Sequence, residues 1–180
     1  MGSNKLHKVQ KHVQKKKGKN PNLHENSRDT QRLQRASARD DKVNRLTAIR
    51  EKQNRPYLLR VKYFQTCAES RGWGTFTTPE TQILIDGYLQ RDNEELAAIQ
   101  AERRPGRPPS TRETLLKQAQ AQEQGEYISG YWVPHLEDAE TLKQLKDWSG
   151  QWSGLNQLKF IRVTKEGVRK ESAFPPKGLS

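Results

Sequence analysis

The sequence predicts a mostly α-helical protein: a small helical body with an extended basic N-terminal arm and a short C-terminal extended segment. Three distributions along the chain predict it. Residues 1–62 hold 18 Lys and Arg against 5 Asp and Glu, a net charge of +13 in a chain whose total is +12. Every Phe, Trp and Tyr lies from Tyr57 onward, so only the later part can form a core. Residues 29–53 contain neither Pro nor Gly and are rich in good helix formers.

Residues 1–28 are expected to form a basic arm without regular structure, because a charged segment of low hydrophobicity cannot offset the entropy of folding. Such an arm requires a polyanion, and a phosphate backbone is the simplest one. Basic runs of this kind are also typical of nuclear import signals. The predicted RNA contacts of the arm are Lys5, Lys8, Lys11, Lys15, Lys16, Lys17 and Lys19.

A basic helix is predicted over residues 29–55, with Pro56 ending or kinking it because the residue before a proline disfavours helical angles. Its basic residues recur every three or four positions, so they form one stripe along the helix. Like charges at this spacing repel by a few tenths of a kcal/mol per pair, a cost that bound phosphates would remove. The sparse apolar residues scatter, so no broad face for docking on a core is expected. The predicted contacts here are Arg28, Arg32, Arg35, Arg39 and Lys42, which form the stripe, and Arg45.

The helical body is predicted over residues 56–167. A helix follows Pro56, with Tyr57, Val61, Phe64 and Ala68 at helical spacing, and a Gly-Trp-Gly run ends it. The next helix opens at residues 77–80, which combine a capping Thr with a proline in the first turn. Residues 91–96 restart or continue it.

The second half of the body is predicted to contain two helices and two extended segments. Ser110 and Glu113 form a capping box for a helix over residues 111–129. An extended stretch over residues 131–134 and a helix over residues 138–148 follow. Residues 158–163 alternate apolar and basic side chains, as a half-buried strand does. Residues 168–180 are expected to form a disordered tail.

The most specific local motif is the loop at residues 103–110, Arg-Arg-Pro-Gly-Arg-Pro-Pro-Ser. Its prolines restrict the backbone, so its guanidinium groups are presented at little entropic cost. We expect an ordered loop between two helices that contacts RNA phosphate or a protein. The AT-hook of DNA-binding proteins is a related pattern, but here Pro105 interrupts its Arg-Gly-Arg-Pro core. The predicted contacts of this region are Arg103, Arg104, Arg107 and Arg112.

No motif points to catalysis, a metal or a cofactor. Cys67 is the single cysteine, which excludes a Cys cluster and an internal disulfide, and it is expected to be a buried small hydrophobe. Three of the four histidines lie in the arm, without the spacing of metal ligands. No apolar run approaches the ~18 residues of a membrane span, so we expect a soluble intracellular monomer without a membrane partner. Trp132 and Trp148 are expected in the core, and Trp73 is the best candidate for an exposed aromatic contact.

Beside the Lys-rich N-terminus and the striped helix, four segments stand out: residues 91–96 (Arg-Asp-Asn-Glu-Glu-Leu), residues 103–110, residues 147–150 (Asp-Trp-Ser-Gly) and residues 158–163 (Leu-Lys-Phe-Ile-Arg-Val). In this order, they resemble the translation machinery-associated protein 16 family of eukaryotes. The likeness extends from about Lys5 to Gly167. It implies a non-enzymatic assembly factor that binds rRNA, ribosomal proteins and other assembly factors of pre-60S particles in the nucleus, including the nucleolus.

Two other functions fit the same residues. A chromatin or DNA-binding protein could use the Arg-Pro-Gly-Arg-Pro loop at residues 104–108 as an AT-hook-like element in the minor groove. Alternatively, the chain is a protein-interaction adaptor whose basic arm serves only nuclear import. Competition between AT-rich DNA and structured rRNA separates the first from RNA binding, and replacement of residues 1–24 by a foreign import signal tests the second.

Overall fold

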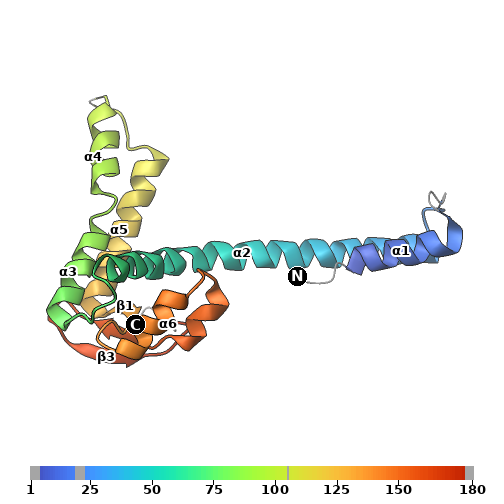
Figure 1. The fold of residues 1–180 in the computed structure, drawn as a ribbon. Helices are drawn as coiled ribbons and strands as arrows, with labels where there is room; N and C mark the ends of the chain where they lie inside the picture. Colours follow the sequence, from blue (N-terminus) through green and yellow to red (C-terminus); the bar gives the residue numbers. More distant parts are fainter. Residues whose placement is uncertain (1–4, 19–22, 105, 177–180) are drawn as a thin grey trace. The chain divides into compact units, whose positions relative to one another are not determined.

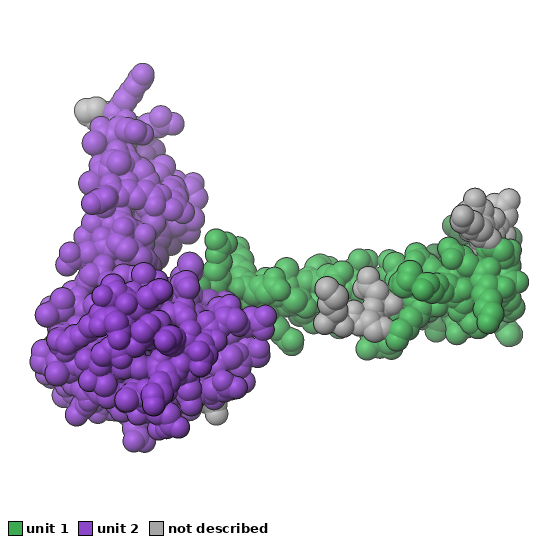
Figure 2. All heavy atoms as spheres, viewed as in Figure 1, with its two compact units in different colours: residues 1–55 green, residues 56–180 purple. Residues whose placement is uncertain are grey.

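The computed structural model describes residues 5–18, 23–104 and 106–176. The chain divides into two compact units, residues 1–55 and residues 56–180, coloured separately in Figure 2. The elements are mostly helical, which confirms the predicted fold class.

Unit 1 is a helical hairpin. Helix α1 (Lys5–Lys17) lies beside the first part of helix α2 (Arg28–Ser70), as Figure 1 shows. The backbone N–H of Leu6 donates to Asp40 at 2.9 Å, and Lys17 pairs with Asp29 at 3.1 Å, so the two helices run antiparallel. Between these contacts Val13 is 3% exposed, the lowest value in the unit. This small seam joins the helices.

The structure differs here from the expected arm without regular structure, because residues 5–17 are helical. The reason is a short apolar repeat: Leu6, Val9 and Val13 are spaced three and four residues apart and therefore share one side of a helix. On α2, Ala36 is 8% exposed and offers a small surface against which that side packs. A partner helix supplies the stabilisation that the basic segment lacks alone.

Helix α2 also corrects the expectation that Pro56 ends the basic helix, since α2 continues through Pro56 to Ser70. Proline removes one backbone donor, and this cost is smaller where water can reach the freed carbonyl. Lys52, whose carbonyl loses its donor, is exposed. Beyond the proline, Val61 and Phe64 are fully buried and hold the helix to the core of unit 2.

Unit 2 combines helices with a small antiparallel sheet of strand order β1-β2-β3. In the register, Tyr131 faces Val163 across the first pair and Phe160 faces Ser172 across the second. The helices are α3 (Thr78–Leu89), α4 (Asn93–Glu102), α5 (Thr111–Ser129), α6 (Ala139–Asp147) and the 3-10 helix η1 (Trp152–Gln157). The strands are β1 (Tyr131–Pro134), β2 (Phe160–Val163) and β3 (Arg169–Ser172).

The core of unit 2 is built on β1, whose four residues are all buried. Trp132 is fully buried and stacks on Phe160 with ring centroids 4.1 Å apart. Trp148 is 7% exposed, so the prediction that these two tryptophans lie in the core is confirmed. Large aromatic side chains contribute most of the buried apolar area in a core of this size.

The expectation that residues 168–180 form a disordered tail is wrong for the part that the structure describes. Residues 169–172 form strand β3, which pairs with β2. Phe174 then contacts the aromatic core, with ring centroids 4.8 Å from Trp152 and 5.9 Å from Phe160. The polar sequence of β3 does not predict a strand. The strand is stabilised by backbone hydrogen bonds to β2 and by the aromatic contacts of Phe174, which follows it. Residues 177–180 lie outside the described residues.

Candidate nucleic-acid interface

The basic stripe of α2 is exposed along its whole length. Arg35 donates from Nε to the carbonyl oxygen of Gln31 at 3.3 Å, a contact within its own helix. Among the described residues, no carboxylate forms an ion pair with any stripe residue. Five exposed cations that form no ion pair within the described residues are available to an external polyanion. The stripe residues are Arg28, Arg32, Arg35, Arg39 and Lys42, and Arg45 beyond them is exposed as well.

Formation of the hairpin leaves this stripe free. The side of α2 that meets α1 carries Asp29, Ala36 and Asp40. At 100° per residue, this side is centred roughly 100° around the helix axis from the stripe. The seam therefore fixes α1 to α2 without covering the guanidinium groups.

The lysines of α1 fall into two groups. Lys17 pairs with Asp29, whose carboxylate is buried, and this hydrogen bond holds the pKa of Asp29 below its usual range. Lys17 is thus part of the hairpin rather than a free cation. The predicted contact Lys19 lies outside the described residues. The remaining predicted contacts are all exposed: Lys5, Lys8, Lys11, Lys15 and Lys16.

Three of these lysines make a second basic row. Lys8, Lys11 and Lys15 follow one another at three and four residues, and at 100° per residue they lie on the side of α1 opposite to Val13. Because Val13 faces the seam, the row faces away from α2. Unit 1 consequently carries a row of cations on each of its helices.

Unit 2 contributes a separate basic site at the connection between α4 and α5. Of the four predicted arginines, two have carboxylate partners within the unit. Arg103 donates from Nη1 to both oxygens of Glu113 at 3.0 and 3.1 Å, and Arg112 forms a two-bond pair with Glu95 at 2.7 and 2.9 Å. These two arginines hold the connection together, so we leave them out of the candidate interface.

Arg104 and Arg107 remain exposed in the same loop, with no ion-pair partner in the part of the chain that the structure describes. The Arg107 N–H donates to the Arg104 carbonyl oxygen at 3.1 Å, and Gly106 between them has a φ of 81°, which glycine adopts without strain. Arg107 also lines a hollow of about 490 Å³ at this tip. The loop thus presents two guanidinium groups on a tight turn.

Polar pairs position this tip, because no residue of α4 is buried. Figure 1 shows α4 and α5 side by side. Ser110 caps α5, accepting from the Glu113 N–H at 3.1 Å, which is one half of the predicted capping box; the Glu113 carboxylate accepts from Arg103 and Lys117 instead. The fully buried Glu113 has its pKa lowered by its hydrogen bond to Lys117 and by Arg103. The cross-links between the helices are Arg91–Glu123, Asn93–Gln120, Glu95–Arg112 and Arg103–Glu113.

Sequence reasoning did not single out Arg60, which is a structural cation. It is 4% exposed and donates to both oxygens of Glu126 at 2.7 and 2.8 Å and to the Trp132 carbonyl oxygen at 3.3 Å. Its guanidinium carbon lies 3.9 Å from the Tyr131 ring centroid. Burial by itself would lower the pKa of Arg60, but the hydrogen bonds to Glu126 raise it above its usual value. The position between Leu59 and Val61, in an otherwise apolar stretch, is the available sequence signal.

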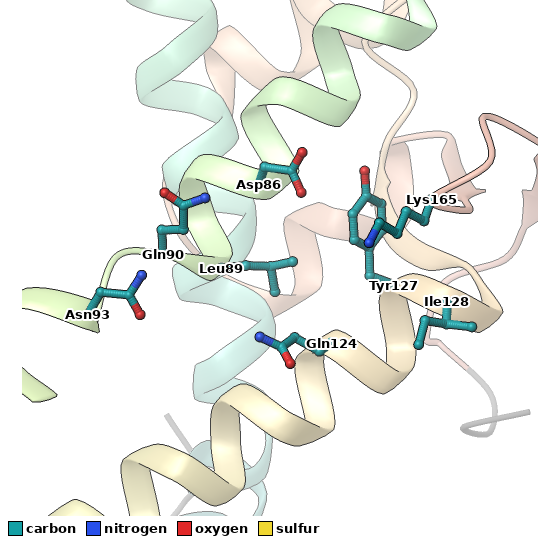
Figure 3. A pocket seen from close by; sticks show the side chains of 8 residues that line it. All are labelled: Asp86, Leu89, Gln90, Asn93, Gln124, Tyr127, Ile128 and Lys165. Carbon is teal, nitrogen blue, oxygen red and sulfur yellow. The ribbon is translucent and has the colours of Figure 1, made fainter.

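A groove between α3 and α5 is the second feature that sequence reasoning missed. Its volume is about 330 Å³, and Figure 3 shows Leu89 pointing into it. Hydrogen bonds from Gln82 Nε2 to the Thr164 and Lys165 carbonyl oxygens fix its rim. Lys165 is the one cation in its lining, so the groove does not suit a phosphate backbone. The lining residues are Asp86, Leu89, Gln90, Asn93, Gln124, Tyr127, Ile128 and Lys165.

Two isoleucines near this groove are unusually exposed. Ile128 lines the groove and is 72% exposed, and Ile83, one turn before Asp86 on α3, is 70% exposed. Exposed aliphatic side chains beside a preformed hollow are typical of surfaces that bind other proteins.

The remaining candidates fit no reactive or metal site. Cys67 is half-buried rather than fully buried as expected, and burial raises the pKa of its thiol, which disfavours the reactive thiolate. Trp73 is also half-buried, with Lys146 Nζ 6.0 Å from its ring centroid. Within the described residues, no cluster of His, Cys, Asp and Glu could hold a metal ion. A search of the same residues finds no helix with the length and apolar character to cross a membrane.

Comparisons with known proteins converge on one family. The family model of translation machinery-associated protein 16 matches residues 19–165. The Saccharomyces cerevisiae protein of that name is 35% identical over 165 residues, which cover 90% of this chain and 92% of the yeast protein. The Xenopus tropicalis protein is 27% identical, over 87% of this chain and 81% of its own. The Mus musculus protein is 26% identical, over 78% and 66%.

Proposed function

Because the chain belongs to the translation machinery-associated protein 16 family, we propose that it is a non-enzymatic assembly factor for large-subunit (pre-60S) ribosomal precursors. It binds the rRNA and the proteins of these particles. The observation that carries the proposal is the exposed, unpaired basic stripe of α2 in a chain whose relatives are named for their association with the translation machinery.

RNA is the ligand that best fits the stripe. Five like charges along one helix repel one another, and none is neutralised by a carboxylate among the described residues. A phosphate backbone removes the repulsion and releases counterions, which makes the binding favourable and strongly dependent on salt. Arg104 and Arg107 offer a second contact of the same kind in unit 2.

A protein of the particle would occupy the groove between α3 and α5. Its apolar wall and the exposed Ile128 suit an aliphatic or aromatic anchor, while Asp86 at its rim favours an adjacent Lys or Arg of the partner. Such a partner combines apolar and basic side chains. Ribosomal proteins and other assembly factors are therefore the protein partners in this proposal.

The proposal includes localisation to the nucleus, including the nucleolus. It also includes a role without catalysis. The Lys-rich run in residues 4–19 matches the charge pattern of import signals. The sequence carries no phosphate-binding glycine loop and no nucleophile motif, which supports a binding role over an enzymatic one.

The test is to tag the full chain, separate a nuclear extract on a sucrose gradient and sequence the RNA crosslinked to the protein. We expect migration with large-subunit precursors and crosslinks clustered at a few rRNA sites. The triple variant Arg32→Gln, Arg35→Gln, Arg39→Gln should leave the particle while remaining folded. A matched variant with Lys143, Lys146 and Lys170 changed to Gln removes the same charge from exposed positions of unit 2 and should stay bound. Migration with chromatin instead would refute the proposal.

A further inference from the structure

We propose that the hairpin of unit 1 binds duplex RNA through its phosphate backbone, without reading the base sequence. This inference rests on the proposed RNA binding and adds the class of RNA. It requires a rigid basic surface, the absence of an aromatic stacking platform and a ligand of high charge density.

The basic surface is rigid because the hairpin is folded. The Leu6–Asp40 and Lys17–Asp29 contacts fix both ends of α1, and Val13 is buried between them. The stripe from Arg28 to Lys42 covers 14 residue steps, which span about 21 Å at 1.5 Å per residue. A straight row of this length matches a stiff rod better than a flexible chain, which must lose conformational freedom in order to follow it.

Unit 1 has no Phe, Trp or Tyr on which an unpaired base could stack, so only Arg guanidinium planes are available for stacking along the stripe. Its 55 residues contain no Phe, Trp or Tyr, and its histidines lie outside the stripe. Proteins that hold single strands obtain about 1–3 kcal/mol per base from aromatic stacking. Sequence-specific RNA recognition likewise depends on splayed bases and aromatic platforms. A single strand would therefore gain electrostatic attraction and Arg stacking from this surface, without the aromatic stacking energy that single-strand binders use.

Charge density then favours the duplex. Because of counterion release, the logarithm of the binding constant falls with the logarithm of the salt concentration. The slope, or salt exponent, is about 0.9 per phosphate contact on B-form DNA, taken here for duplex RNA as well, and about 0.7 on a single strand. For the five stripe cations, the difference in exponent is about 1, or roughly tenfold in affinity at ~0.1 M salt. The second row on α1, with Lys8, Lys11 and Lys15, adds cations on another face of the hairpin.

The direct test is fluorescence anisotropy of the full chain with a 20-base-pair RNA duplex, with each of its strands alone, and with a second duplex of unrelated sequence. The strands are chosen to be free of internal pairing. We expect the duplex to bind about tenfold more tightly than either strand at ~0.1 M salt, and the two duplexes to agree within about twofold. Equal or tighter binding of a single strand would overturn the inference, as would a large difference between the duplexes.

The stripe variant assigns the effect to unit 1. Changing Arg32, Arg35 and Arg39 to Gln should lower the salt exponent for the duplex by about 2.7, whereas changing Lys143, Lys146 and Lys170 to Gln should leave it unchanged. An unchanged exponent in the stripe variant would also overturn the inference. Binding of single strands as well as duplexes defeats the inference alone, but failure to bind any RNA defeats the proposed function as well.

Discussion

Replacing Glu126 by Ala should lower the free energy of unfolding of unit 2 by about 3–5 kcal/mol, because it leaves the charge of Arg60 buried without a counter-ion. Arg60 is 4% exposed, and Glu126 accepts its two shortest hydrogen bonds, at 2.7 and 2.8 Å. The contacts that would remain are the Trp132 carbonyl oxygen at 3.3 Å and the face of the Tyr131 ring at 3.9 Å. Neither carries a full negative charge.

The loss is large for a domain of this size, whose total stability is expected within about 5–15 kcal/mol. Two further variants separate the cost of an unpaired charge from the loss of side-chain packing. In the double variant Arg60→Met, Glu126→Leu both charges disappear while the volume is largely kept, so the part of the loss that comes from the unpaired charge should return. The part that remains reflects the Trp132 N–H, which donates to Glu126 at 3.2 Å and loses its acceptor in both variants. Glu123→Ala, on the same helix, breaks the more exposed pair with Arg91 and should cost less than about 1 kcal/mol.

Urea unfolding of the full chain, followed by tryptophan fluorescence, measures these differences, because Trp132 is fully buried in the folded unit. The four proteins are compared under one condition, and the shift in midpoint is converted with a common slope. A loss below about 1 kcal/mol for Glu126→Ala would refute the reasoning, as would a double variant no more stable than the single one.

Three other outcomes follow from the contacts described. Val13→Asp places a charge in the seam of the hairpin and should release α1, which is measured as a loss of helical circular dichroism with the urea midpoint of unit 2 unchanged; an unaltered spectrum would exclude the seam. Ile128→Glu should weaken association with the particle but leave the melting temperature within about 2 °C, since the side chain is 72% exposed, and full retention on the gradient would rule the groove out. Hydrogen bonds from Arg71 and Thr77 lower the pKa of Glu80 to about 2, so its contribution to stability is present above about pH 4 and is lost as the pH falls toward 2. Thermal unfolding between pH 5 and pH 2 should show a weaker acid dependence for Glu80→Gln, and identical curves would contradict this role.

The sequence predicts an element correctly where the residues at the ends of that element mark its start and stop. Helix α5 begins and ends where predicted, because Ser110 caps its first turn and Gly130 follows its last residue. Helix α1 and strand β3 were missed because each depends on a neighbour that is distant in the sequence. Val13 packs within a seam that Ala36 completes, and β3 pairs with β2 and is followed by Phe174. In the same way, the expected helix end at Pro56 is wrong because the burial of Val61 and Phe64 outweighs the local preference of proline against the helix interior.

The same distinction between local signals and contacts with distant residues applies to the candidate site. The stripe of α2 could be placed from spacing alone, since helical periodicity puts Arg28 and Lys42 on one side, and the structure has both exposed. Spacing alone could not predict which arginines of the loop region pair with a carboxylate and which stay exposed. Arg103 and Arg112 are taken up by Glu113 and Glu95, which lie 10 and 17 residues away across a helical hairpin, and only the three-dimensional pairing reveals this. The groove between α3 and α5 is missed for the same reason.

The way α4 and α5 are joined makes the reach of their tip adjustable. Because no residue of α4 is buried, its length is not constrained by the core of unit 2. Adding or removing one turn in both helices would move Arg104 and Arg107 by about 5.4 Å along the hairpin while leaving every aromatic contact of the core intact. The length of the α4–α5 pair therefore sets how far from the core of unit 2 the guanidinium groups of Arg104 and Arg107 can contact a partner.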